Sequence, residues 1–184
     1  MSRLKPKVLE LGCGSGSNTW FLSKEGFDTY GIDNSPTALE LCKQTLAQWG
    51  TPATLTLGEM TKLPYPDNFF DFVVDVVSMQ HLNLQEHEQC ISEIKRVLKK
   101  GGRFFSFHLG SNSISNQGKK LDECTVENIP QGLPLENNGP TCFLTEKKVW
   151  ELLQDFEVNI ETITRTYNGK PVEYLIIEAI KSVD

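Results

Sequence analysis

The 184-residue sequence is acidic, with a formal net charge of -6 and an isoelectric point near 5.2. Its 39% hydrophobic and 23% charged residues are typical of a soluble globular protein, and the length suits one domain over residues 1–184. The acidic balance argues against a nucleic-acid partner and favours a small or cationic substrate. Because no apolar run could span a bilayer and residues 1–6 contain no signal peptide, we expect a cytoplasmic protein with no membrane partner.

The cysteines indicate the redox environment. There are five, at positions 13, 42, 90, 124 and 142, and no two of them form a C-x-x-C pair. An odd number at wide spacing predicts neither a disulfide framework nor a zinc site. We therefore expect reduced thiols and no bound metal.

A strand, a glycine-rich turn and a helix open the chain. Residues 8–11 are a short apolar run that suits a buried parallel strand, and a helix is predicted over residues 17–25, with Trp20 and Phe21 in the core. A second strand ends at Asp33. Glycines in such a turn adopt dihedral angles closed to other residues, and they let a ligand approach the positive start of the helix. The unit predicts a site for an adenosine-bearing cofactor, with Asp33 placed to bind its ribose.

The spacing of the glycines distinguishes between cofactors. A dinucleotide fingerprint, G-x-G-x-x-G, would need glycine where the sequence has Ser17 or Thr19. A nicotinamide-dependent dehydrogenase is therefore disfavoured. The sequence instead has an acid followed at alternate positions by three glycines, namely Glu10, Gly12, Gly14 and Gly16. This pattern resembles the nucleotide loop of the class I S-adenosylmethionine-dependent methyltransferases, in particular those that act on small molecules.

The resemblance implies S-adenosylmethionine as the cofactor and assigns roles to the residues around the loop. It places Glu10 near the methionine end, the three glycines beneath the cofactor, and Asp33 on the ribose with Asn34 beside it. An acid is reasonable at position 10 because the ammonium and sulfonium groups are positive. The residues alone leave open that Glu10 caps backbone amides in a tight turn.

A second helix and a third strand follow. The helix is predicted to run from Pro36, with Ser35 as its N-cap, to Gly50. Its buried face is predicted to consist of Leu39, Leu46 and Trp49. The strand is predicted over residues 53–57.

Two stretches after this strand extend the resemblance. Glu59 and Met60 stand where an acid and the next backbone amide bind the adenine in the family. Residues 63–71 look like the L-P-[FY]-x-[DE]-x-x-F-D stretch of small-molecule methyltransferases. This is the most specific single stretch in the chain.

Residues 72–77 predict a fourth strand that is buried on both faces. Ligands in open α/β sheets bind beyond the carboxyl ends of the strands, so the residues there should face the cofactor cleft, namely Asp75, Val76, Gln80 and His81. The sequence after this strand does not resemble the [DNS]-P-P-[FYW] loop that methylates amino groups of bases. Such groups are therefore disfavoured as substrates.

A helix over residues 85–99 and a strand over 103–109 complete the parallel part of the predicted sheet. His87 is predicted to lie on a solvated face of the helix. His108, at the end of the strand, is predicted to point toward the cleft and is the best candidate for a catalytic base, with Asp75 as the second candidate. The alternative for His108 is a histidine that bonds to the backbone.

The carboxyl-terminal third predicts a lid and a hairpin. Residues 110–144 are rich in Ser, Asn, Gly and Pro without a convincing element of their own, and we interpret them as a lid over the substrate end. Residues 157–166 and 172–181 then alternate as the two strands of a hairpin. The predicted fold is a Rossmann-like three-layer α/β sandwich, whose mostly parallel seven-stranded sheet ends in this antiparallel hairpin.

The resemblance covers residues 8–181 and departs from the family at one place. The family usually has helices ahead of the first strand that help cover the active site, and residues 1–6 are too few for one. We therefore expect an open pocket, or one that a partner chain or a second copy covers. The predicted function is methyl transfer to the oxygen, nitrogen or sulfur of a small-molecule acceptor. The alternative is a non-catalytic module that binds S-adenosylmethionine and regulates a partner.

Overall fold

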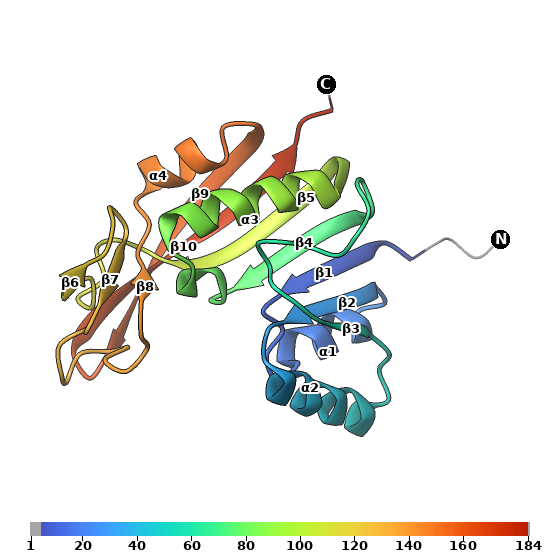
Figure 1. Ribbon diagram of the computed structural model, residues 1–184, viewed down its shortest axis with the longest axis horizontal. Helices are drawn as coiled ribbons and strands as arrows, with labels where there is room; N and C mark the ends of the chain where they lie inside the picture. Colours follow the sequence, from blue (N-terminus) through green and yellow to red (C-terminus); the bar gives the residue numbers. More distant parts are fainter. Residues whose placement is uncertain (1–4, 184) are drawn as a thin grey trace.

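The computed structural model describes residues 5–183. Its elements follow one another in the order β1 (Lys7–Leu11), α1 (Ser17–Lys24), β2 (Asp28–Asp33), α2 (Pro36–Trp49), β3 (Thr54–Leu57), β4 (Phe70–Val76), the 3₁₀ helix η1 (Met79–His81), α3 (Leu84–Val97), β5 (Leu98–Leu109), β6 (Lys119–Lys120), β7 (Thr125–Glu127), β8 (Thr141–Cys142), α4 (Glu146–Leu152), β9 (Phe156–Tyr167) and β10 (Lys170–Lys181) (Figure 1). None of the described helices is both long and apolar enough to cross a membrane.

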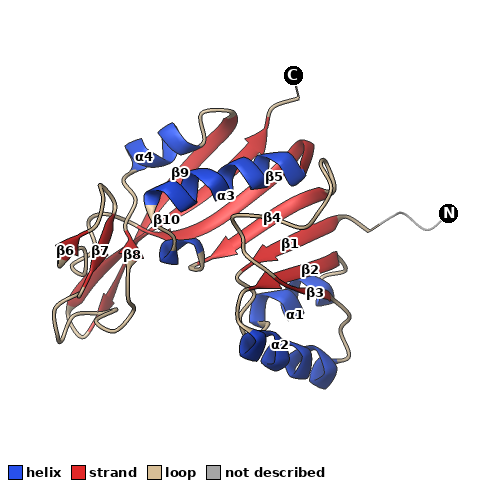
Figure 2. Ribbon diagram, viewed as in Figure 1, coloured by secondary structure: helices blue, strands red, loops and turns tan. Residues whose placement is uncertain are grey.

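Seven strands form the central sheet in the order β3-β2-β1-β4-β5-β10-β9. The first five pair in parallel, and β10 pairs antiparallel with both β5 and β9 (Figure 2). This arrangement confirms the predicted fold class. Because the connections leave β1 and β4 in opposite directions across the sheet, a crevice opens between their carboxyl ends, where ligands bind in such folds.

Two successive residues of β1 show that helices cover both faces of the sheet. Leu9 belongs to the buried cluster that contains Ile94 of α3, whereas the carboxylate of Glu10 accepts a hydrogen bond from Thr19 of α1. Successive side chains of a strand point to opposite faces, so α3 and α1 lie on opposite sides of β1. The sheet is therefore the middle of three layers, as predicted.

Several helical positions differ from the sequence prediction. Phe21 and Trp49 are 52% and 58% exposed, so neither is a core residue. In α1 the buried residues are the smaller Thr19 and Ser23, because this face lies directly over the buried Glu10. In α2 the buried face is Leu39, Cys42 and Leu46, and Trp49, in the last turn, packs against Trp20 at a ring distance of 5.2 Å.

Three element boundaries also differ. The helix predicted to reach residue 99 ends at Val97, and β5 begins at Leu98 rather than at 103. Gly101 and Gly102 therefore lie within this strand. Strand β4 ends at Val76, because Val77 adopts a positive φ of 53°.

Residues 110–144, here named the insertion, have a sheet of their own. Strands β6, β7 and β8 pair antiparallel in that order, so the prediction that this segment lacks elements is wrong. The two ends of the insertion meet, since Gly110 forms a bridge with Leu144. Strands of two or three residues are too short to be predicted from sequence alone.

The first turn of α3 allows a test of helix capping. The Asn83 side chain accepts a hydrogen bond from Glu86 N at 3.0 Å, and the Glu86 carboxylate accepts one from Asn83 N at 2.8 Å. Replacing Asn83 with Ala should lower the free energy of unfolding by about 1 kcal/mol, because this capping box is lost. Urea denaturation measures the change. The control Ser92→Ala, at an exposed position of the same helix, should change it by less than about 0.5 kcal/mol; equal effects would contradict the prediction.

Candidate functional site

The loop after β1 is shaped by its glycines. Gly12, Gly14 and Gly16 have φ angles of 58°, 52° and 90°, which residues with a side chain rarely adopt. A Cβ atom on Gly12 would lie 2.4 Å from the Cβ of Ser78, so the close contact with the segment after β4 also requires glycine. The loop leads directly into α1, whose N-cap is Gly16.

Asp33, the last residue of β2, holds this loop in place. Its Oδ2 accepts a hydrogen bond from Gly14 N at 2.8 Å, and its Oδ1 accepts one from Ser35 N at 2.9 Å. The carboxylate therefore fixes the distance between the loop after β1 and the start of α2. It also lines the cavity described next.

A cavity of about 460 Å³ lies at the carboxyl ends of β1 to β4. Seven residues that were predicted to bind the cofactor line it, namely Gly12, Asp33, Asn34, Glu59, Met60, Val76 and His81. The other lining residues were not predicted from the sequence; they are Ile32, Gly58, Val77, Ser78, Leu82 and Glu86. Most of these are immediate neighbours of predicted residues, so the rule that locates ligands at strand ends could have found them.

The charge of this cavity suits a cationic ligand. Asp33, Glu59 and Glu86 contribute three carboxylates to its lining. Asn34 Nδ2 donates to Glu59 Oε2 at 3.4 Å, which connects the segments after β2 and β3. Carboxylates at these positions favour a ligand that carries ammonium or sulfonium charge.

Glu10 lies beneath the loop rather than in the cavity lining. It is 2% exposed and accepts hydrogen bonds from Asn18 Nδ2, at 2.9 Å, and from Thr19 Oγ1. Burial raises the pKa of its carboxyl group from 4.5 to about 7, although the hydrogen bonds from Thr19 and Asn18 act in the opposite direction. In this structure Glu10 connects β1 to α1.

Asp75 and Gln80 were predicted to face the cleft, and the structure places both in the interior. Asp75 is fully buried and accepts hydrogen bonds from Met79 N at 2.9 Å and from Ser106 Oγ at 2.6 Å. Asp75 is next to Val76 in β4, and successive side chains of a strand point to opposite faces of the sheet. Because Val76 lines the cavity, Asp75 points away from it. Gln80 is 6% exposed, and its Oε1 has no hydrogen-bond partner among the described residues.

The predictions for the histidines of α3 and β5 were also wrong in orientation. His87 is fully buried instead of solvated, and His108 is 1% exposed and does not line the cavity. Their Nε2 atoms lie 3.1 Å apart in the core. His108 Nδ1 contacts the backbone oxygen of Leu109 at 3.0 Å, which is the alternative that the sequence left open.

The raised pKa of Glu10 predicts a specific dependence of stability on pH. Because the folded-state pKa lies above the unfolded value, the stabilisation is complete below about pH 4.5 and is lost as pH rises to about 7. Across this window the wild type should lose about 3 kcal/mol relative to Glu10→Gln, which cannot ionise. Urea unfolding of both proteins as a function of pH measures the difference. Parallel pH profiles would contradict the prediction.

Comparison with known proteins places this geometry in a family. Residues 9–106, more than half of the chain, match a family described as a methyltransferase domain. An uncharacterised methyltransferase of Synechocystis is 37% identical over 98 residues, which cover 53% of this chain and 44% of that protein. A demethylmenaquinone methyltransferase of Symbiobacterium thermophilum is 36% identical over 103 residues, which cover 53% of this chain and 40% of that protein. The matching region thus spans less than half of each relative.

A solved structure supports the fold over the whole chain. That protein, a SAM-dependent methyltransferase from Methanosarcina mazei, has a TM-score of 0.84 and 22% identity, and the match covers 99% of this chain and 95% of that one. The glycine loop and the stretch at 63–71 both lie within the region that matches the family. The chain belongs to the family of methyltransferase domains.

Proposed function

We propose that the cavity beyond β1 to β4 binds S-adenosylmethionine and that the protein transfers its methyl group to a small, largely apolar acceptor. The observation that carries the proposal is the joint lining of one cavity by Gly12, Asp33 and Glu59, which lie at the ends of three strands. A site with carboxylates and a closely approachable backbone matches the ribose and the positive charge of this cofactor.

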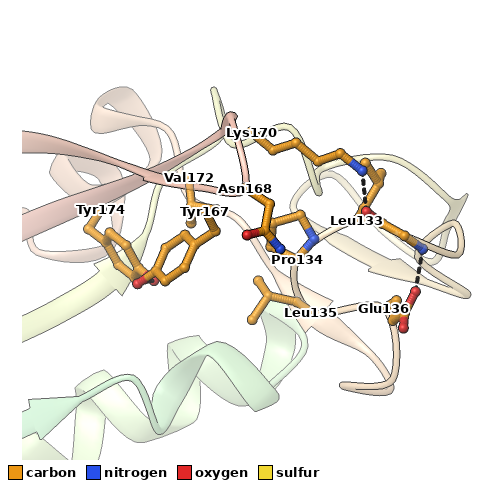
Figure 3. Close-up of a pocket in the computed structure, with 10 residues that line it drawn as sticks. Leu133, Pro134, Leu135, Glu136, Tyr167, Asn168, Lys170, Val172 and Tyr174 are labelled. Carbon is orange, nitrogen blue, oxygen red and sulfur yellow. Dashed lines mark hydrogen bonds between the residues drawn. The ribbon is translucent and has the colours of Figure 1, made fainter.

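A second cavity supports the assignment of the acceptor side. It has a volume of about 500 Å³ and lies between the insertion and the tip of the β9–β10 hairpin (Figure 3). Leu133, Pro134 and Leu135 contribute one wall, and Tyr167, Val172 and Tyr174 the other. The hairpin extends beyond the end of β5, because Tyr174 pairs with Leu109, the last residue of that strand.

Both cavities border the same hydrophobic cluster. Val77 lines the first cavity and packs against the same buried cluster as Leu133 and Leu135, which line the second. An acceptor held in the second cavity would therefore approach the cofactor past the end of β4. The apolar walls favour an acceptor with a ring or a hydrocarbon portion.

Methyl transfer from a sulfonium needs mainly the correct position of donor and acceptor. An alcohol acceptor also needs a base within hydrogen-bond reach. His108 and Asp75 are buried outside the cavity, so we infer that His81, which lines it, takes this role for such an acceptor. Partial burial lowers the pKa of His81, which leaves its imidazole neutral and able to accept a proton near pH 7.

Binding of the cofactor gives the first test. Replacing Asp33 with Ala should weaken S-adenosylmethionine binding by about 10- to 100-fold, because a charged hydrogen bond to the ribose is lost. Calorimetric titration of both proteins measures this change. The control Asp28→Ala lies at the other end of β2, in a half-exposed ion pair with Lys7, and should bind normally. Unchanged affinity in Asp33→Ala, or no binding by the wild type, would contradict the proposal.

The acceptor side has a separate test. Transfer from radiolabelled cofactor to a panel of apolar alcohols, thiols and amines identifies an acceptor. Leu135→Trp, which fills the second cavity, should then lower kcat/KM for this acceptor by at least about 10-fold while cofactor affinity stays unchanged. The control Leu121→Trp, at an exposed leucine of the insertion, should keep normal activity. Cofactor binding without transfer to any member of the panel would favour the non-catalytic module instead.

A further inference from the structure

Three buried side chains from different parts of the fold meet outside the cofactor cavity. They are His87 on α3, His108 on β5 and Cys142 on β8, and none is more than 1% exposed. One nitrogen of each imidazole and the Sγ of Cys142 all lie within 4.8 Å of one another. The proposed methyl transfer uses none of these groups.

The hydrogen atoms of the two imidazoles do not account for their contacts. His87 Nδ1 lies 3.0 Å from the backbone oxygen of Asn83, and His108 Nδ1 lies 3.0 Å from that of Leu109. A backbone oxygen only accepts hydrogen bonds, so each Nδ1 must carry a proton. In neutral imidazoles both Nε2 atoms then carry lone pairs, and these atoms face each other at 3.1 Å. Two neutral rings thus supply one proton to each Nδ1 contact and leave none for the contact between the two Nε2 atoms.

A third proton would remove the conflict only by creating a charged ring in the core. Both rings are at most 1% exposed, and an unpaired charge in such a position is costly. A metal cation that accepts electron density from both lone pairs at once resolves the conflict without a proton on either Nε2.

We propose that His87, His108 and Cys142 bind one zinc ion through the two Nε2 atoms and Sγ. Imidazole and thiolate are the ligands that zinc prefers in proteins. Zinc–nitrogen bonds of about 2.0–2.1 Å in a tetrahedral site separate two nitrogens by about 3.3 Å, close to the 3.1 Å found here. Bonding of each Nδ1 to a backbone oxygen is also the usual outer-shell arrangement of a metal-bound histidine.

Cys124 is our candidate for a fourth ligand. It is 5% exposed, and its backbone oxygen accepts a hydrogen bond from Phe143 N at 2.9 Å, so it lies beside Cys142 in the fold. On metal binding each thiol would lose its proton to solvent. Two thiolates and two neutral imidazoles then give a tetrahedral site with no net charge, which suits a buried position.

The location of the site indicates a structural role. Cys124 and Cys142 belong to the insertion, whereas His87 and His108 belong to α3 and β5 of the main domain. The metal would therefore fix the insertion over the carboxyl end of the sheet. The sequence pattern could not show this, because the ligands are 16 to 21 residues apart along the chain and form none of the usual metal motifs.

Metal titration of the full-length chain, stripped with a chelator and kept reduced, tests the site directly. Wild-type protein should bind one equivalent of Zn²⁺, and Co²⁺ should produce the thiolate charge-transfer band and the intense visible bands of a tetrahedral site. Cys142→Ser should weaken metal binding by more than the roughly 10- to 100-fold that loss of an outer-shell partner costs. His87→Gln should have the same effect and provides a second variant if the first does not fold.

The matched control is Cys90→Ser. Cys90 is equally buried and lies on α3 three residues from His87, but it is not part of the cluster. This variant should bind one equivalent of Zn²⁺ and give the wild-type Co²⁺ spectrum. Failure of the wild type to bind a stoichiometric metal, or wild-type binding by Cys142→Ser, would overturn the proposal. A disulfide between Cys124 and Cys142 in metal-free native protein, found by thiol labelling and mass spectrometry, would also overturn it. None of these readouts depends on methyl transfer or cofactor binding.

Discussion

The close packing of two loops, one after β1 and one after β4, determines the geometry of the cofactor cavity. Gly12 permits this packing, because any Cβ atom there would overlap with Ser78. Ser78 Oγ in turn contacts the backbone oxygen of Leu11 at 2.8 Å and Asp75 Oδ1 at 2.5 Å. Since Asp75 also accepts a hydrogen bond from Ser106, the loops after β1 and β4 are connected to β5. Asp75 thus positions the cavity walls.

The insertion and the antiparallel hairpin add a second structural unit at the same end of the sheet. Strands β5 and β10 pair up to the last residue of β5, and the hairpin tip continues beyond it. The insertion leaves and rejoins the domain at one point, the bridge between Gly110 and Leu144. Apolar residues from both units surround the second cavity. A metal ion at the insertion's base would hold this acceptor side in a fixed position relative to the cofactor side.

Local signals in the sequence were sufficient for the fold and for part of the candidate site. The glycine loop, the Ser35 cap and the breaker at Gly50 each specify backbone geometry through a single residue type, and the structure contains all three as predicted. The rule that ligands bind at strand ends selected Asp33 and His81, and the structure has both in the lining of the cavity. That they bind the cofactor stays a prediction. These predictions depend only on the order of elements along the chain.

The orientation of side chains was harder to predict. The strand-end rule gives the end of the sheet but not the face, so it could not separate Val76 from Asp75. His87 lies at helical spacing with the buried Cys90, Ile91 and Ile94, and its polarity alone suggested the solvated face. Its actual partner is His108, which is 21 residues away. Such a contact arises from the packing of α3 on β5 and has no local signal.

The position of the cofactor can be determined from a crystal structure with S-adenosylhomocysteine, its demethylated product. We expect the ribose hydroxyls to contact the Asp33 carboxylate, the adenine to lie beside Glu59 and Met60, and the sulfur to point past the end of β4 toward the second cavity. A nucleoside bound elsewhere on the protein, or one whose sulfur points away from the insertion, would contradict this expectation.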